Sequence, residues 1–229
     1  AYGVSSLDLK PVSVISGPGN RYVAMAKRLV SAEVGIDSEA GPTEIAIIAD
    51  HTASPDLIAA DLVSQAEHDE LAQVVLITTE AALVDSVSSH LERRARTTPH
   101  ANRVRQALAG QQSALIIVDS VQQALTVSDA LAPEHLEIMT DQAHDVAQMV
   151  KNAGAVFVGP YTPVSAGDYL AGSNHVLPTG GHAKFQAGLS AMSFLRPQQI
   201  VHYDRSALQD ISDQIQVFAR AENLPAHAE

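Results

Sequence analysis

Short apolar runs alternate along most of this chain with longer segments in which apolar residues recur every three or four positions. Continuous apolar runs are typical of strands buried on both faces of a parallel sheet, and the wider spacing is typical of helices that cover such a sheet. Strands are predicted at 12–16, 44–50, 72–79, 114–120, 135–140 and 155–159. Helices are predicted at 21–34, 54–68, 121–131, 141–152 and 205–221, with further helical stretches up to about residue 108. This order predicts an α/β fold, a Rossmann-like parallel sheet with flanking helices and a small C-terminal helical extension.

The alternation stops after Gly159. Residues 160–197 are rich in Gly, Ser, Pro and His, and a loop of this length in a compact chain is usually functional or disordered. The last helical segment carries a narrow apolar stripe, formed by Leu208, Ile211, Ile215 and Phe218. Such a stripe requires a partner surface, and the sequence leaves open whether this belongs to the same domain or to a second subunit.

The composition excludes several classes of function and of metal site. The formal net charge is −12 at pH 7, and the chain has five Tyr, four Phe and no Trp. General nucleic-acid binding is excluded, because it needs a basic footprint or aromatic stacking platforms. Cys is absent, so a bound metal would be held by nitrogen and oxygen donors. No apolar run approaches the length of a membrane span and no signal-type segment opens the chain, so we expect a cytoplasmic protein without membrane contact.

Two local patterns are candidates for binding. The turn SGPGN at 16–20 follows a predicted strand and opens a helix, so its amides could face an anion, although a tight turn with a helix cap is favoured. The helix at 54–68 places Gln65 and His68 three residues apart on its buried face. That spacing suits two metal ligands, and it equally suits a buried pair whose members satisfy each other or backbone carbonyls.

Further polar groups gather in the second half of the chain. In LAPEHLEI, Glu134 stands beside His135, so an imidazole that can shuttle protons neighbours a carboxylate that can orient water; a solvated loop is the alternative. In GDYLAGSNHVLPTGG, Asp168 can begin a helix or bind a metal, and His175 lies in a glycine-bracketed loop, with a flexible surface loop as the alternative.

Together these strings resemble the histidinol dehydrogenase family of NAD-dependent enzymes. The matching stretches run in family order across essentially the whole chain: GPGNRYVAMAKRLV, GIDSEAGPTEIAIIAD, DLVSQAEHDELAQ, LAPEHLEI, NAGAVFVG, GDYLAGSNHVLPT and AENLPAHAE. The resemblance implies that this chain is a C-terminal portion that begins midway, with an incomplete sheet. It also implies part of a second, cofactor-side domain at 1–43, a main α/β domain with the metal and catalytic loops at 44–197, and a helical dimerisation segment at 198–229.

The resemblance assigns roles to individual residues. One Zn²⁺ ion is implied, with the ligands Gln65, His68, Asp168 and His227. Catalysis is implied for the water-activating Glu134 and the general base His135. Contacts with L-histidinol are implied for Thr43, Gln65, His68, Glu134, His135, Asp168, His175, Glu222 and His227, and a contact with NAD for Asn20. A homodimer is implied, in which the C-terminal segment reaches the partner's site and the partner subunit covers the apolar stripe.

The implied reaction is the oxidation of L-histidinol through histidinaldehyde to L-histidine with two NAD, the last steps of histidine biosynthesis. Thr43 stands where the family usually has Ser, and this change keeps the hydroxyl. We expect the chain on its own to bind NAD weakly and to turn over little. Two alternatives remain at this point: a relative that oxidises another small primary alcohol, and a metal-binding or assembly fragment without activity.

Overall fold

The computed structural model describes residue 10 and residues 12–229. The chain divides into two compact units, Ala1–Phe194 and Leu195–Glu229, and each is described by itself. The predicted region 1–43 therefore begins outside the described residues. Within the described part, no helix is both long and apolar enough to cross a membrane.

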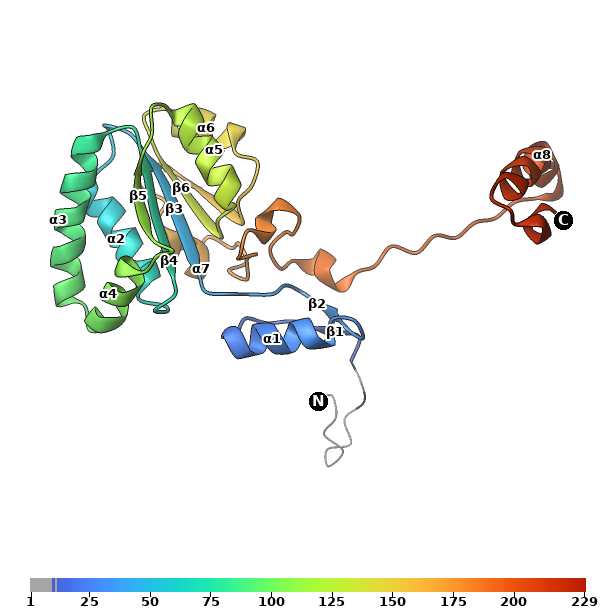
Figure 1. Ribbon diagram of the computed structural model, residues 1–229, viewed down its shortest axis with the longest axis horizontal. Coiled ribbons are helices and arrows are strands. Elements are labelled where there is room, and N and C mark those ends of the chain that lie inside the picture. Colours follow the sequence, from blue (N-terminus) through green and yellow to red (C-terminus); the bar gives the residue numbers. More distant parts are fainter. Residues whose placement is uncertain (1–9, 11) are drawn as a thin grey trace. The chain divides into compact units, whose positions relative to one another are not determined.

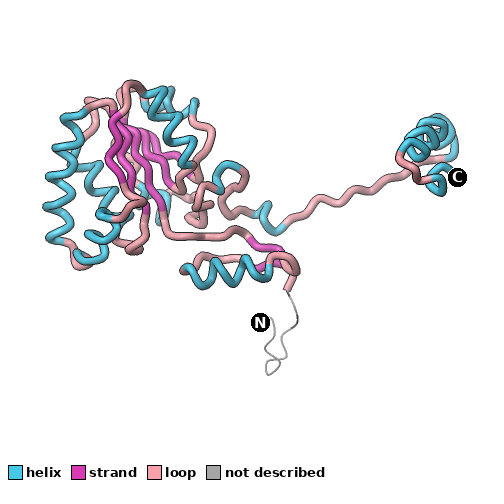
Figure 2. The backbone as a smooth tube through the Cα atoms, in the orientation of Figure 1, coloured by secondary structure: helices cyan, strands magenta, loops and turns pink. Residues whose placement is uncertain are grey.

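A five-stranded parallel sheet forms the centre of the first unit (Figures 1 and 2). Its strands are β3 (Glu44–Ala49), β4 (Gln73–Thr78), β5 (Ala114–Ile117), β6 (His135–Met139) and β7 (Ala155–Val158), in the order β5-β4-β3-β6-β7. The register sets Ile45 of β3 opposite both Val74 and His135. The predicted parallel α/β fold is thus confirmed, with β3 in the middle and β6 as its neighbour.

Helices cover both faces of this sheet because its central strands are apolar on both sides. One face carries α2 (Pro55–Ala66), α3 (Ala81–Thr97) and α4 (Ala101–Ala109), and the other carries α5 (Val121–Leu131) and α6 (Ala143–Met149) (Figure 1). Alternate residues of β3 supply the two cores, with Ile45 and Ile47 toward α2 and Ala46 and Ile48 toward α5. Ser120 begins α5 by accepting the N–H of Gln123.

The remaining elements are short or terminal. Near the N-terminus, β1 (Val14–Ile15) and β2 (Gly35–Ile36) pair in parallel and flank α1 (Arg21–Val30). The predicted loop 160–197 is interrupted by α7 (Val164–Tyr169) and by the short 3₁₀ helices His182–Lys184 and Ala191–Phe194. The second unit holds α8 (Arg205–Ala221), begun by an Asp204 cap, and the 3₁₀ helix Pro225–Ala228.

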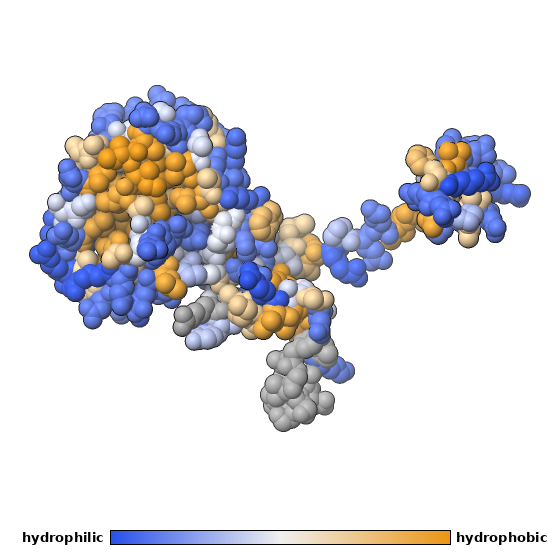
Figure 3. All heavy atoms as spheres, viewed as in Figure 1, coloured by the Kyte–Doolittle hydropathy of each residue, from blue (hydrophilic) through white to orange (hydrophobic). Residues whose placement is uncertain are grey.

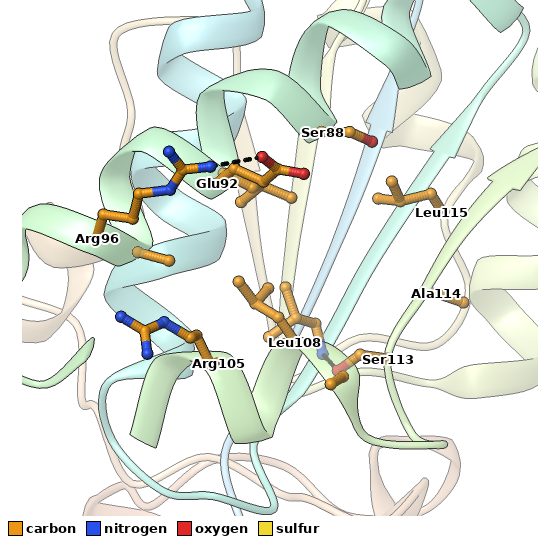
Figure 4. Close-up of a pocket in the computed structure, with 12 residues that line it drawn as sticks. Ser88, Glu92, Arg96, Arg105, Leu108, Ser113, Ala114 and Leu115 are labelled. Carbon is orange, nitrogen blue, oxygen red and sulfur yellow. Dashed lines mark hydrogen bonds and ion pairs between the residues drawn. The ribbon is translucent and has the colours of Figure 1, made fainter. Parts of the chain in front are cut away.

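The β5 edge of the sheet is poorly covered. Leu115 is 36 % and Ile117 55 % exposed, and Figure 3 shows apolar surface gathered over this part of the first unit. Beside it, α3, α4 and β5 enclose a groove of about 640 Å³ with a mainly apolar wall (Figure 4). Its charged lining residues are Glu92, Arg96 and Arg105, of which the first two form an ion pair. This groove holds none of the predicted site residues.

Candidate functional site

The predicted chemistry gathers at the amino ends of the central strands. Thr43 immediately precedes β3, Glu134 immediately precedes β6, and His135 is the first residue of β6. Because α2 returns antiparallel to the strands, its C-terminal end lies at the same edge and brings Gln65 and His68 there. The sequence reasoning did not specify this edge, and in open α/β sheets ligands usually bind at the opposite, carboxyl edge.

The carboxyl ends of β3 and β6 are joined by hydrogen bonds at the point where the strand order reverses. Asp50, which follows β3, donates its N–H to the carbonyl of Met139 in β6, 3.3 Å away. Its carboxylate accepts the N–H of Asp141 at 2.9 Å and the hydroxyl of Thr52 at 2.6 Å. These contacts join the ends of β3 and β6 directly. A hollow of about 570 Å³ lies at the carboxyl ends of β6 and β7, and none of the predicted site residues lines it.

A cavity of about 990 Å³ lies at the amino edge. Among its lining residues are eight predicted ones: Asn20, Thr43, Gln65, His68, Glu134, His135, Asp168 and His175. Sequence reasoning missed other lining residues, namely Tyr22, Asp69, Glu70, Arg103 and Thr179. Segments that lie more than a hundred residues apart in the sequence thus meet in one cavity.

Glu222 and His227, the two other predicted site residues, belong to the second unit. They line a smaller hollow of about 440 Å³ between α8 and the last 3₁₀ helix. Of the apolar stripe, Ile211, Ile215 and Phe218 line the same hollow, and Phe218 is 72 % exposed. The second unit therefore presents both polar residues beside an uncovered apolar surface.

Glu134 is buried, so the solvated-loop alternative for this segment is wrong. It is 8 % exposed, and its Oε2 accepts the Thr43 hydroxyl at 2.6 Å and the N–H of Glu44 at 3.0 Å. Burial raises the pKa of Glu134 to about 7, against these two hydrogen bonds, which lower it. A carboxyl group with that pKa can exchange a proton near neutral pH.

His135 is held in one tautomer. Its Nδ1 lies 3.0 Å from the carbonyl oxygen of Glu44, and because a carbonyl only accepts, Nδ1 carries the proton. Nε2 is buried and has no hydrogen-bond partner in the described part of the chain, and the nearest carboxylate, Asp168, lies 3.8 Å away. Burial lowers the pKa of His135, so the unprotonated Nε2 is available as a base at neutral pH. Its Nδ1 lies 3.6 Å from Oε2 of Glu134, too far for a hydrogen bond, as expected for adjacent residues.

Gln65 and His68, at the end of α2 and just beyond it, differ from the prediction in the exposure of His68. Gln65 is 2 % exposed, as expected, whereas His68 is exposed because α2 ends at Ala66 and the chain turns outward. The two side chains do not satisfy each other: the Gln65 amide nitrogen donates to the Thr43 hydroxyl. The amide oxygen of Gln65 and the imidazole of His68 are thus both available to a ligand in the cavity.

Asp168 reaches the cavity through a close packing contact. It lies in the last turn of α7, so the expectation that it begins a helix is wrong. A Cβ on Gly167 would stand 2.6 Å from the ring of Phe157, which means that only glycine lets α7 rest on this ring. Phe157 in turn lies 5.9 Å from the His135 ring, centroid to centroid. This stack places the Asp168 carboxylate beside Nε2 of His135.

The donor atoms in the cavity fit a metal ion that prefers nitrogen and oxygen. Gln65, His68 and Asp168 offer an amide oxygen, an imidazole and a carboxylate, which suit Zn²⁺ in the absence of thiolates. Within the described residues, no three His, Asp or Glu side chains form a ready-made metal cluster.

Asn20 acts as the cap that the composition of SGPGN favours. Its Oδ1 accepts the N–H groups of Tyr22 and Val23 at the start of α1, and the residue also lines the cavity. The turn before it is fixed by a buried ion pair: Lys27 and Asp37 lie 2.5 Å apart and both bond the backbone of Gly17. The turn is therefore rigid, which suits a wall of a binding cavity.

The chain is similar to known proteins over its whole length. The family model for histidinol dehydrogenase matches residues 1–229. Histidinol dehydrogenase of Leifsonia xyli is 57 % identical over the whole chain, and that of Mycobacterium tuberculosis 55 %. The chain spans about half the length of these relatives, 52 % in both cases. The crystal structure of histidinol dehydrogenase from Elizabethkingia anophelis matches 96 % of the chain and 51 % of that protein, with a TM-score of 0.88 and 38 % identity. The chain belongs to the histidinol dehydrogenase family.

Proposed function

We propose that this chain supplies the acid–base pair and four metal ligands of a cytoplasmic histidinol dehydrogenase, which oxidises L-histidinol through histidinaldehyde to L-histidine. The observation that carries the proposal is the cavity itself. It combines a histidine with a free, unprotonated Nε2, a carboxyl group with a pKa of about 7, and an amide, an imidazole and a carboxylate suited to a metal. Family membership supports L-histidinol as the substrate, and eight of the ten residues that the resemblance implies line the cavity.

In the first step, His135 would act as the general base. The substrate hydroxyl gives its proton to Nε2 while the carbinol carbon loses a hydride, which leaves the aldehyde. NAD supplies the acceptor for this hydride, and Asn20, on the cavity wall, is the residue proposed to contact it. The Glu44 carbonyl keeps the proton on Nδ1, so Nε2 stays the basic atom throughout.

In the second step, Glu134 would orient and deprotonate the water that adds to the aldehyde. The hydrated aldehyde then loses a second hydride to a second NAD, and the product is the carboxylic acid. Glu134 suits this role because the Thr43 hydroxyl and the Glu44 N–H hold its Oε2 in one place. Since its pKa is about 7, the group can take up and release a proton at neutral pH.

The metal would serve to bind rather than to react. Gln65, His68, Asp168 and His227 are the proposed ligands, and a bound Zn²⁺ would anchor the amino and imidazole nitrogens of the substrate. The charge of the cavity favours cations, both the metal ion and the substrate, because its lining includes the carboxyl groups of Asp69, Glu70, Glu134 and Asp168. Of the described lining residues, only Arg103 is an arginine or lysine. A cationic amino alcohol is therefore attracted and an anionic substrate is disfavoured.

A homodimer is part of the proposal. Glu222 and His227 would complete the site of the partner subunit, with Glu222 contacting the substrate and His227 serving as the fourth ligand. Two features of the second unit support this arrangement: both residues share a hollow, and the apolar surface beside them is exposed. Association of α8 with another subunit would remove that surface from water.

Zinc content and turnover test the proposal together. Gln65→Ala, His68→Ala and Asp168→Ala are each expected to lower the zinc retained after dialysis and the NADH formed from L-histidinol. His100→Ala is the matched control, because this imidazole is exposed at the start of α4 and does not line the cavity. Equal zinc retention in all four variants would show that these side chains do not bind the metal.

A further inference from the structure

Glu44 makes four hydrogen bonds around the catalytic pair. Its N–H donates to Oε2 of Glu134 at 3.0 Å, and its carbonyl oxygen accepts from Nδ1 of His135 at 3.0 Å. Its carboxylate accepts the N–H of Glu134 at 3.3 Å and the N–H of Gly180 at 2.8 Å. One residue thus contacts the backbone and the side chain of Glu134, the imidazole of His135, and the loop that carries His175.

The two kinds of contact have different consequences. The backbone groups of residue 44 remain whatever side chain is present, so they fix the tautomer of His135 independently of the glutamate. The carboxylate, by contrast, is the only group of Glu44 that reaches Gly180, and it joins the start of β3 to a loop far away in the sequence. Thr179, one residue before, bonds back to the same region, since its hydroxyl accepts the N–H of Gly41 at 2.6 Å.

The position is unusual for an ionised side chain. Glu44 opens a strand whose other residues are all buried, and its carboxylate is partly buried beside a second carboxylate, that of Glu134. Placing two acidic groups together is unfavourable unless hydrogen bonds compensate. The N–H groups of Glu134 and Gly180 supply two such hydrogen bonds to the Glu44 carboxylate.

We infer that Glu44 is a positioning residue of the site: its carboxylate fixes the backbone of Glu134 relative to the loop that ends at Gly180. The inference rests on the function proposed above for Glu134 and His135. Glu44 does not touch the reacting atoms. It sets the position of the Glu134 carboxylate relative to the loop that carries His175. A displacement of about 1 Å in a catalytic group can lower a rate about 100-fold.

Three variants separate this role from a general effect on folding. Glu44→Gln keeps the volume and one acceptor oxygen but turns an NH₂ group toward one of the two backbone N–H groups. Glu44→Ala removes both acceptors. Glu80→Gln is the matched control, because Glu80 follows the neighbouring strand β4 at the opposite edge and its carboxylate accepts only from Thr79 in the described contacts.

Amide hydrogen exchange measured by NMR tests the contact without any need for activity. In Glu44→Ala, the N–H groups of Glu134 and Gly180 are expected to exchange on the order of 10- to 100-fold faster, because each loses a hydrogen bond to a charged group. Glu44→Gln should accelerate one of the two, and Glu80→Gln neither. Amides in the middle of β3 should be unchanged in all three, which excludes global unfolding as the cause. Unchanged exchange at both positions in Glu44→Ala would overturn the inference.

Steady-state kinetics with L-histidinol and NAD then test the positioning role. We expect kcat to fall about 10- to 100-fold in Glu44→Ala and less in Glu44→Gln, with KM changed less than about threefold. Faster exchange with unchanged kcat would overturn the positioning role. These kinetics are measured on the chain joined to the other half that its full-length relatives carry. If that enzyme shows no turnover while it holds zinc and NAD, the proposed function fails, and the exchange data still decide whether Glu44 fixes these two segments.

Discussion

Replacing Gly154 by alanine is expected to displace the backbone that carries the catalytic pair. A Cβ at this position would stand 2.5 Å from the carbonyl oxygen of Glu134 and 3.3 Å from its Cα. Ordinary contact begins at 3.4 Å, so the two backbones must separate by roughly 0.9 Å. Two hydrogen bonds of 2.9 Å join them, from Gly154 to Pro133 and from Ala155 to Glu134, and both would lengthen.

The expected loss of stability follows from these contacts. Overpacking against backbone costs about 1–3 kcal/mol, and the lower entropy of the unfolded alanine variant offsets about 0.4–1 kcal/mol of this. We therefore expect the free energy of unfolding in urea to fall by about 1–2 kcal/mol. Because Glu134 itself moves, kcat with L-histidinol should fall about 10-fold or more.

Gly110→Ala provides the matched control. Its Cβ would also meet atoms closer than 3 Å, but these belong to the end of the Gln112 side chain, which can rotate at the cost of its hydrogen bonds to the carbonyls of Ala72 and Ala107. Its free energy of unfolding should fall by less than about 1 kcal/mol, with kcat unaffected because Gln112 lies outside the cavity. If Gly154→Ala matched this control in both measurements, the close approach of residue 154 to Glu134 would have no energetic role, and the reasoning would be refuted.

The buried Lys27–Asp37 pair gives a pH prediction. Burial alone would raise the pKa of Asp37, but hydrogen bonds from Lys27 and from two backbone N–H groups hold this pKa below its usual value. The contribution of Asp37 to stability is therefore present above about pH 4, and it is lost as the pH falls through the lowered pKa. Urea unfolding between pH 2 and 6 should show this loss in the wild type and not in Asp37→Asn, and Lys27→Met should cost about 3 kcal/mol at pH 7. Thr43→Val should lower kcat about 10-fold, whereas Thr43→Ser should keep it, because the hydroxyl that bonds Glu134 is retained. Phe218→Asp should shift the sedimentation coefficient from dimer to monomer, and a dimer unchanged by it would contradict the role of α8.

The pattern of apolar residues was sufficient to predict the central sheet, because this pattern reflects which residues are buried. After Glu44, the run IAIIA at 45–49 is apolar at every position, and these residues of β3 are buried in the middle of the sheet. Strand 114–120 was predicted too long, since β5 lies at the edge, ends at Ile117, and exposes residues that its composition could not distinguish from a buried strand. The ends of helices were also predicted less accurately than the positions of strands. The predicted helix 54–68 includes His68, whereas α2 stops at Ala66, so His68 lies outside the helix and is exposed.

The site was only partly accessible from sequence. Glu134 and His135 stand next to each other and could be paired without a structure. Local patterns also singled out Gln65, His68, Asp168 and His175, and the family resemblance supplied the roles and the remaining residues. Glu44 was missed, although a charged residue at the start of a fully apolar strand is a signal that could have found it. The contact between Gly167 and Phe157 had no sequence signal, because close packing of two distant segments is a property of the fold alone.

The most direct measurement locates zinc in a crystal of this chain grown with the metal and L-histidinol. Anomalous scattering at the zinc edge is expected to give one strong peak in the cavity at the amino ends of β3 and β6. It should lie about 2.0–2.2 Å from a carboxylate oxygen of Asp168, an imidazole nitrogen of His68 and the amide oxygen of Gln65. A peak bound by other residues, with these three side chains left free, would contradict the account.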